Sequence, residues 1–297
     1  MIHLQSNDLA KIQADVLIAG YQPDIITYHD RELNRIMSTL INHAGGTNYY
    51  HFKKKLLNDN KITECSLTDS GDIKNAKKLL FTCMPQISED KQPNNQNGRI
   101  QEYFREVKLK MPEMEKCYEN MFKVIEEYNE KLEAEIADLA EEIESSISTT
   151  STSKIPKLEK QSSSKTGIAG IPPPPPLPDL SIKTKIQKIK SKKLSSIAIP
   201  ILGTQFRHCF PHKECVELLV RVSFEYLYGP KSKQSSQHQI KDIILVSNEE
   251  RSEVEFLRML EKYSKIYENG GPEKGSLTDE KVPLPPVPPP VALATEA

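Results

Sequence analysis

The sequence predicts an α/β fold, in which helices cover both faces of a sheet and a long insertion interrupts the domain. Short apolar runs typical of buried strands alternate with segments whose apolar residues recur at helical spacing. Hydrophobic residues make up only 37% of the chain, below the roughly 45–50% of a compact domain. Prolines outnumber glycines by 21 to 12, and 12 of the prolines lie in the runs 171–178 and 283–290. Long segments therefore lack a core-forming pattern.

The first part of the predicted domain spans residues 1–132. Helical spacing over 30–44 predicts a helix that Gly45-Gly46 ends. Asp8 is predicted to begin a short helical turn as its N-cap, and a longer helix is expected to begin at Pro112, because proline suits the first turn of a helix. Four segments have the apolar or alternating patterns of strands, and these are residues 2–5, 15–19, 62–68 and 78–84.

The helix after Pro112 carries a long apolar stripe and a strongly acidic surface. Residues 113–147 contain 12 acidic residues and 3 lysines. An amphipathic helix of this length has to bury its stripe. Beyond residue 132 it is therefore expected to pair with another chain as a coiled coil, to fold back or to fray. The stripe consists of Met121, Ile125, Tyr128, Leu132, Ile136, Leu139, Ile143 and Ile147.

Residues 133–193 are predicted to be an insertion, made of this acidic extension and a disordered stretch rich in Ser, Pro and Lys. The Ser- and Thr-rich composition of 145–165 predicts disorder, and the proline run at 172–178 predicts polyproline II. Ser181–Lys193 carries six lysines and no acidic residue. We interpret it as a solubilising flank, with an import signal or a contact to an anionic surface as alternatives.

The second part of the predicted domain spans residues 194–268, and a disordered Pro-rich tail follows at 269–297. Strands are predicted at 196–202 and 240–246. Helices are predicted at 214–226 and 253–267. The residues expected to face the core are Val216, Leu219, Val220 and Phe224 in the first helix and Val254, Leu257, Leu260 and Tyr263 in the second.

Composition excludes several classes of protein. The formal net charge of −1 gives no bulk attraction to nucleic acid, and no apolar run reaches the roughly 18–20 residues of a membrane span. The first residues lack the basic and apolar regions of a signal peptide. Five dispersed cysteines favour reduced thiols over a disulfide framework. We expect a cytoplasmic or nuclear protein that contacts neither membrane nor a specific nucleic acid.

Several stretches, taken in their order along the chain, resemble the macro domain, the ADP-ribose-binding α/β module. The segment 3–11, together with the predicted strand that follows it, resembles the opening strand, the first loop and the second strand of that family. Residues 65–84 resemble its next pair of strands, and 115–120 the start of a helix. Residues 196–204, followed by Phe210-Pro211, resemble its second phosphate loop. The resemblance implies a three-layer α/β/α domain with a mixed sheet.

The resemblance also implies a binding site. Asp8 would accept a hydrogen bond from the adenine amino group, and the backbone N–H of Leu9 could face the same ring. Gly203 and Thr204 would let backbone N–H groups approach a diphosphate. Gln205 follows where the family has glycine, and Phe206 lies near where an aromatic residue packs on the distal ribose. The alternatives are that Asp8 only caps a short helix and that the loop only connects a strand to a helix.

Two departures from the family pattern argue against catalysis. Where the family has Asn-Ala-Ala-Asn after the second strand, this chain has Ala19-Gly20-Tyr21-Gln22. Where the first phosphate loop is usually rich in glycine, this chain has Thr27–Glu32, with two acidic residues and no glycine. Bulky side chains would resist close approach of a diphosphate, and acidic ones would repel it. We therefore predict a module without catalytic residues and without a cofactor.

A compact group of metal-type ligands follows the second phosphate loop. His208, Cys209, His212 and Cys215 lie within eight residues. No second chelating half accompanies them, and Cys215 falls where a helix core face begins. We interpret the two cysteines as a loop thiol and a buried thiol, and we assign neither a zinc site nor a nucleophilic Cys–His pair.

The two proline runs indicate a second kind of interaction. Both contain P-x-x-P and would be preformed ligands for SH3, WW, EVH1 or profilin modules. A stiff spacer without a reader is the alternative. We therefore predict a macro-type binder of ADP-ribose or an ADP-ribosylated protein, with a ligand-free scaffold as the alternative and an ADP-ribosyl hydrolase as the least favoured. The prolines assigned to docking are Pro172, Pro173, Pro174, Pro175, Pro176, Pro178, Pro285, Pro286, Pro288 and Pro289.

Overall fold

The structure is a computed structural model of the chain. It describes residues 1–21, 40, 43–44, 61–88, 100–150, 179–204, 210–230, 239–247 and 250–269. Most of the helix predicted at 30–44, both proline runs, and Gln205 with Phe206 lie outside these residues. In the described part, no helix combines the length and the apolar character needed to span a membrane.

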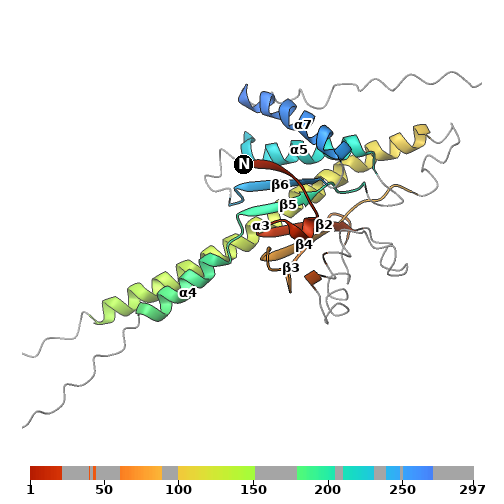
Figure 1. The fold of residues 1–297 in the computed structure, drawn as a ribbon. Helices are drawn as coiled ribbons and strands as arrows, with labels where there is room; N and C mark the ends of the chain where they lie inside the picture. The colour runs from red at the N-terminus through yellow and green to blue at the C-terminus, as the bar shows by residue number, and fades with distance from the viewer. Residues whose placement is uncertain are drawn as a thin grey trace, which may run out of the picture.

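One mixed sheet forms the middle of the domain (Figure 1). Its strand order is β1-β6-β5-β2-β4-β3. Five neighbouring strands run parallel, and β3 pairs antiparallel with β4 at one edge. Every residue of β2 is buried, which is expected for a central parallel strand covered on both faces. The strands are β1 (Ile2–Ser6), β2 (Val16–Tyr21), β3 (Cys65–Asp69), β4 (Lys78–Cys83), β5 (Ser196–Pro200) and β6 (Asp242–Ser247).

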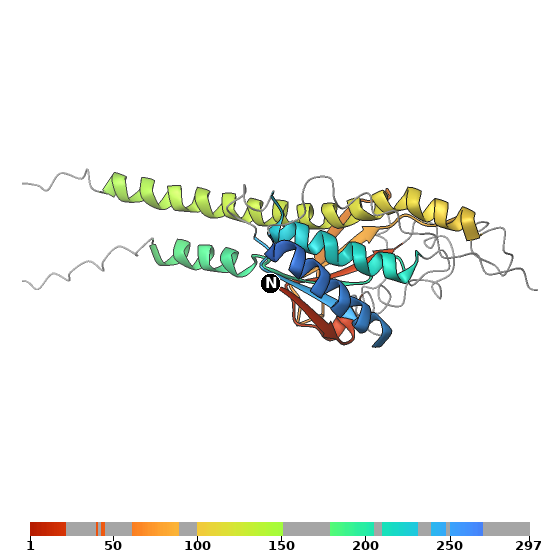
Figure 2. The same cartoon turned by 90° about the horizontal axis from the view of Figure 1, so that it is seen from above.

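Three helices cover one face of the sheet. They are α3 (Ile100–Thr150), α5 (His212–Tyr228) and α7 (Glu250–Glu268), and Figure 2 shows them together on the same side. Their core includes Tyr118 and Met121 of α3 and Leu219 of α5, packed on Ile18 and Ile197. The guanidinium of Arg221 forms a bidentate ion pair with Glu115, each N–O distance being 2.9 Å, which joins α5 to α3.

The other face is covered by the segments that follow β1 and β2. The 3₁₀ helix η1 (Leu9–Lys11) buries Leu9 against the sheet. Leu40 and Ala44, both in helical conformation, pack with Leu17 and Leu79 on the same face. The described segments therefore form the predicted three-layer arrangement, with the sheet between two coverings of different composition.

The helix α3 differs from the prediction at its start. It begins at Ile100 and has Pro112 inside it. Pro112 is exposed, so water can reach the backbone carbonyl that the missing N–H leaves unpaired, which explains why the helix continues through it. With 51 residues, α3 is about 75 Å long at 1.5 Å per residue, and it extends beyond the amino ends of the strands.

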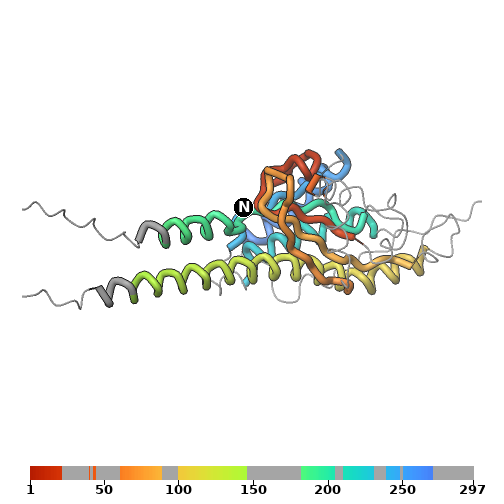
Figure 3. Tube along the Cα trace, turned by 90° about the horizontal axis from the view of Figure 1, so that it is seen from below, coloured from red at the N-terminus to blue at the C-terminus, as the bar shows by residue number. Residues whose placement is uncertain are grey.

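A second correction concerns the lysine-rich segment. It is not part of a disordered stretch, because Asp179–Ser191 form the helix α4. Figures 2 and 3 show α4 lying beside the outer part of α3. Ile182 and Ile189 of α4 are buried, and they lie on the helix face that meets the apolar stripe of α3. The stripe therefore folds back on its own chain, one of the outcomes that the sequence left open.

The predicted inner face of the last helix is wrong in part. Val254 and Leu257 of α7 are 63% and 59% exposed. The residues that pack on the sheet side are Phe256, Met259 and Tyr263. Both sets have helical spacing, so periodicity alone could not separate them.

Candidate functional site

The carboxyl ends of five parallel strands meet at one edge of the sheet. They are the ends of β1, β6, β5, β2 and β4. In open α/β sheets, ligands bind outside this edge, between two adjacent strands whose following connections leave toward opposite faces. The position of such a pair follows from the chain path.

The strands β2 and β5 are such a pair. After β2 the chain passes Leu40 and Ala44, which pack on the face that carries η1. After β5 it enters α5, which packs on the opposite face. The strands are hydrogen-bonded neighbours, with Val16 opposite Ile197. A crevice suited to a ligand is therefore expected between Tyr21, which ends β2, and the residues after β5.

Residues Gly203 and Thr204 form the first turn after β5. Gly203 is buried and has a φ of +85°, a conformation that a side chain disfavours. A Cβ atom there would also lie 3.1 Å from Cε of Met114 and 3.3 Å from Cδ2 of Phe210. The N–H of Phe210 donates to the carbonyl of Gly203 at 2.9 Å. This bond closes the loop 203–210, so its two ends are fixed at the floor of the expected crevice.

The loop leads into the amino end of α5. Pro211 is the N-cap and provides no side-chain hydrogen bond, so among the described residues the N-cap leaves the first N–H groups of the helix without a side-chain partner. Nε2 of His212 lies 2.8 Å from Oγ of Ser252, which fixes the start of α5 to the start of α7. Cys215 is buried beneath Gly203. His212 and Cys215 are therefore engaged in packing, whereas His208 and Cys209 lie outside the described residues.

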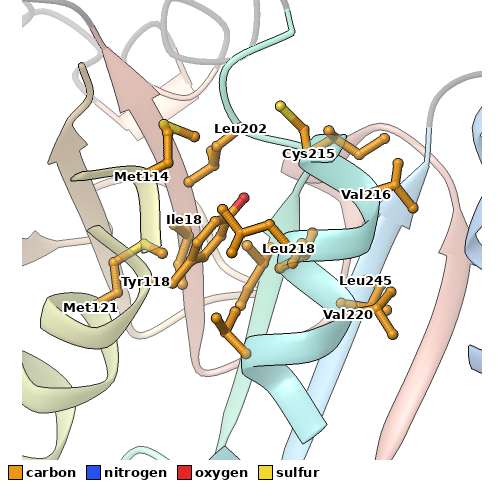
Figure 4. Packing of buried hydrophobic residues seen from close by; sticks show 14 of the residues in the cluster. Ile18, Met114, Tyr118, Met121, Leu202, Cys215, Val216, Leu218, Val220 and Leu245 are labelled. Carbon is orange, nitrogen blue, oxygen red and sulfur yellow. The ribbon is translucent and has the colours of Figure 1, made fainter. Parts of the chain in front are cut away.

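Tyr118 supports this loop from below (Figure 4). The ring is fully buried between Met114, Met121 and Leu218, and its hydroxyl reaches toward Leu202 and Cys215. Burial raises the pKa of the Tyr118 phenol well above its usual value, so the hydroxyl stays neutral. In the sequence, Tyr118 falls in a predicted helix and carries no sign of a role in the site. Only the three-dimensional packing of α3 under the loop reveals this role.

Asp8 lies at the carboxyl end of β1, on the same edge. Its Oδ1 accepts a hydrogen bond from the N–H of Ala10 at 3.1 Å, so it is the N-cap of η1. Asp8 is exposed, and within the described part of the chain Oδ2 has no hydrogen-bond partner. The carboxylate therefore performs the capping role and still offers one oxygen to a ligand. The side chain of Leu9 is buried in the core, which leaves only its backbone for a contact.

The side chain of Asn75, a residue without a recognisable signal in the sequence, joins the end of η1 to the turn between β3 and β4. Its Nδ2 donates to the carbonyl of Ala10 at 3.0 Å and to that of Ile12. The N–H of Ala14 donates to the carbonyl of Asn75 at 3.2 Å. An asparagine in the turn between β3 and β4 gives no local signal of a contact 60 residues away.

The end of β2 is closed by Met84. A Cβ atom on Gly20 would lie 2.3 Å from Sδ of Met84, and the N–H of Met84 donates to the carbonyl of Tyr21 at 2.7 Å. Gly20 and Tyr21 are both buried. Met84 thus packs directly against the last residues of β2. The segment Thr27–Glu32, where the first phosphate loop was sought, lies outside the described residues.

The arrangement is similar to that of solved macrodomain structures. An Oceanobacillus iheyensis macrodomain with MES bound matches with a TM-score of 0.49 and 12% identity, over 88% of this chain and 91% of that chain. A Trypanosoma brucei macrodomain in complex with ADP matches with a TM-score of 0.46 and 11% identity, over 87% of this chain and 68% of that chain. No protein-family model and no curated protein sequence matches the chain.

Proposed function

We propose that the chain is a non-catalytic macro-type module that binds ADP-ribose, or a related adenine nucleotide, at the carboxyl edge of the sheet between β2 and β5. The observation that carries this proposal is the divergence of the chain after these two strands to opposite faces, which is the position where open α/β sheets bind nucleotides. The proposal is built on this chain's own residues.

Adenine recognition is assigned to Asp8. A carboxylate oxygen is an acceptor suited to the amino group of adenine, and Oδ2 is available because only Oδ1 is used to cap η1. The backbone of Leu9 would lie beside the same ring. Asp8 ends the loop after β1, whereas the phosphate groups would lie nearer the centre of the sheet.

Diphosphate binding is assigned to the loop after β5. Gly203 and Thr204 would present backbone N–H groups to the phosphates, and Gln205 with Phe206 would contact the distal ribose. The positive φ of Gly203 and the uncapped first turn of α5 support this assignment, because both arrangements favour the approach of an anion to the backbone.

The same residues argue for binding without turnover. Where the family has Asn-Ala-Ala-Asn, this chain has Ala19-Gly20-Tyr21-Gln22, so the buried Ala19 occupies the first asparagine position. Ala19 therefore supplies no carboxamide that could orient the ribose or a water molecule, and Gln22, at the second asparagine position, lies outside the described residues. A hydrolase would need other groups for this purpose, so ADP-ribosyl hydrolysis is the least favoured activity.

Calorimetric titration of the full chain tests the proposal. ADP-ribose and ADP should bind, and ribose 5-phosphate should bind more weakly. Asp8→Asn keeps an oxygen for the cap but turns an N–H₂ group toward the ligand. The variant should therefore bind ADP-ribose about tenfold more weakly, which is the effect of losing a hydrogen bond to a charged group. It should leave ribose 5-phosphate unchanged. An absence of heat and of thermal shift with millimolar ADP-ribose would contradict the proposal.

The proline run at 172–178 supports a second function, docking to a polyproline-reading domain. Asp179, the first residue of α4, directly follows the run. It lies at the far end of the α3/α4 pair, remote from the carboxyl edge (Figure 1). A partner bound there would not compete with a nucleotide. Replacing Pro172–Pro176 by serine in the full chain should abolish binding to an SH3, WW, EVH1 and profilin panel. Retention of binding in that variant would assign the interaction to the run at 283–290.

A further inference from the structure

The outer part of α3 and the helix α4 form an antiparallel pair, which we call the hairpin (residues 130–150 and 179–191). It extends from the amino edge of the sheet, opposite the proposed nucleotide site. Its base is fixed to the domain by Asn129, whose side chain is fully buried and exchanges two hydrogen bonds with the backbone of Leu194, at 2.7 and 2.8 Å. The ion pair of Lys193 with Glu133 adds to this attachment.

The apolar seam of the hairpin is only partly covered. Leu132, Ile182 and Ile189 are buried. The other seam residues, which are Ile136, Leu139 and Ile143 of α3 and Ile186 of α4, keep intermediate exposure, although they lie on the facing sides of the two helices. Two helices alone leave such a seam open along both grooves, whereas a four-helix bundle closes it. The hairpin thus has an apolar seam that further helices would cover.

The charges on one side of the hairpin form two stripes of opposite sign. The acidic stripe consists of Glu135, Asp138 and Glu142 on α3, and the basic stripe of Lys185, Lys188 and Lys192 on or just after α4. Each has the spacing i, i+3, i+7, which keeps its members on one flank of a helix. All six side chains are exposed.

Within the residues that the structure describes, most of these charges make no ion pair. Glu135, Asp138, Lys185, Lys188 and Lys192 make no ion pair with any other residue of the described structure. On each helix, the charged stripe lies on the flank formed by residues that directly precede seam residues in the sequence. In an antiparallel pair of helices, these two flanks lie on the same side. The acidic stripe and the basic stripe therefore lie next to each other on one face, parallel to the hairpin axis, and both are directed outward.

We propose that two copies of the chain associate through this face, so that α3 of each copy lies against α4 of its partner. A two-fold axis parallel to the hairpin places each acidic stripe over a basic stripe. A two-fold axis across the hairpin would instead oppose acidic with acidic, so charge selects the first arrangement. The result is a four-helix bundle in which every neighbouring pair of helices is antiparallel and the half-covered seam is closed.

This dimer has a consequence for the proline run. Both hairpins point in the same direction, so the two segments that follow Thr150 and precede Asp179 start and end at one end of the assembly. Two polyproline ligands would thus be offered together, which raises avidity for a bivalent partner without any new contact. The proposal does not depend on nucleotide binding, because the hairpin leaves the sheet at the opposite edge.

Sedimentation velocity of the full chain tests the proposal through a charge-swap complementation. At low salt the wild-type chain should be dimeric at micromolar concentration, and the dissociation constant should rise with salt, as expected for exposed charge pairs. The variant Lys185→Glu, Lys188→Glu, Lys192→Glu and the variant Glu135→Lys, Asp138→Lys, Glu142→Lys should each dimerise at least about tenfold more weakly. An equimolar mixture of the two should form a heterodimer, because the contacts between copies are then all of opposite sign.

The complementation separates the proposal from simple loss of structure. Variants that merely unfold the hairpin would not rescue each other, and circular dichroism of each variant measures the helix content directly. The matched control is Lys108→Glu with Lys116→Glu, two exposed lysines of α3 within the domain, which should leave the dimer unchanged. A wild-type chain that stays monomeric at about 100 μM and low salt, or a mixture that remains monomeric, would overturn the proposal.

Discussion

The two edges of the parallel sheet are built by different means. At the amino edge, polar side chains fix segments that are distant in the sequence: Asp15 accepts hydrogen bonds from Ser195, and Asn129 exchanges two with Leu194. At the carboxyl edge, the backbone itself sets the geometry, through the positive φ of Gly203 and the bond from Phe210 to its carbonyl. The amino edge thus depends on side-chain hydrogen bonds between distant segments, whereas the carboxyl edge depends on the conformation of the backbone.

If this comparison holds, a change at the amino edge should cause a large loss of stability, larger than that caused by any change at the carboxyl edge. Asn129→Leu removes two hydrogen bonds inside the protein and leaves the N–H and the carbonyl of Leu194 buried without partners. Each unsatisfied group costs about 1–3 kcal/mol, so the free energy of unfolding should fall by about 3 kcal/mol. Urea denaturation measures it. Affinity for ADP-ribose in the folded fraction should not change.

The matched control is Asn120→Ala. Its side chain donates one hydrogen bond, to the carbonyl of Thr63 at 2.8 Å, from a half-buried position. The substitution should lower the free energy of unfolding by only about 1 kcal/mol. Equal losses in the two variants would show that Asn129 does not fix the strand β5 to α3.

A change at the carboxyl edge should reverse this pattern, with a larger effect on binding than on stability. Gly203→Ala places a Cβ at a φ of +85° and within 3.1 Å of Met114. The strain should reduce the free energy of unfolding by about 1–2 kcal/mol. The substitution should also displace the loop and lower the affinity for ADP-ribose by more than about tenfold, because backbone groups lose their alignment with the phosphates. Calorimetry and urea denaturation of the same preparation measure both effects.

Gly20→Ala provides the comparison at the neighbouring strand. There the atoms nearest to the new Cβ, Sδ and Cε, form the flexible end of the Met84 side chain, which can move aside. Ligand affinity should therefore change much less than in the Gly203 variant. A similar loss in both variants would indicate that general disturbance of the edge, and not the conformation of Gly203, controls binding.

The contribution of Asp15 at the amino edge should depend on pH. Burial alone would raise the pKa of this carboxyl, but hydrogen bonds from Ser195 and the ion pair with Lys77 at 3.0 Å hold it below its usual value. A carboxyl group whose pKa is lower in the folded state than in the unfolded state stabilises the folded protein at pH values above its unfolded pKa. This stabilisation is lost as the pH falls through the folded pKa. Stability should therefore decrease below about pH 4.

Asp15→Asn tests this dependence. The variant should be less stable than the wild type by about 1 kcal/mol at pH 7, where the charged hydrogen bonds count fully. The difference should shrink in acid, below about pH 4. Urea midpoints at pH 7 and pH 3 measure it. A difference that is the same at both values would show that the charge of Asp15 does not contribute.

How far the sequence predicts this molecule depends on whether the relevant contact is local. Buried strands such as β2 and β5 were predictable, because a continuous apolar run is itself the signal. The helix α4 was not, since its four lysines obscure the seam of Ile182, Ile186 and Ile189. The stripe that pairs with this seam lies on α3, about 45 residues earlier. Helix formation here depends on a partner that composition does not reveal.

The candidate site follows the same rule. Asp8 was correctly expected to be able to cap η1, because capping is a contact over two residues. The position of Gly203 after a buried strand could also be predicted from the sequence. The position of the candidate site between β2 and β5 was not, because it depends on which face of the sheet the chain crosses after each of these strands. Tyr118 and Asn75 were missed for the same reason, since each acts on a segment far away in the sequence.

The smallest expected effect concerns α7, where the sequence and the structure disagree about the inner face. Val254 and Leu257 are exposed, whereas Phe256 and Met259 are buried. Val254→Ser with Leu257→Ser should therefore change the free energy of unfolding by less than about 0.5 kcal/mol. Met259→Ala, one turn away on the same helix, should cost about 2–4 kcal/mol through the cavity that it leaves. Urea denaturation of both variants decides which face packs on the sheet. A large loss from the serine pair would restore the face that periodicity predicted and would place α7 in a different rotation on β6.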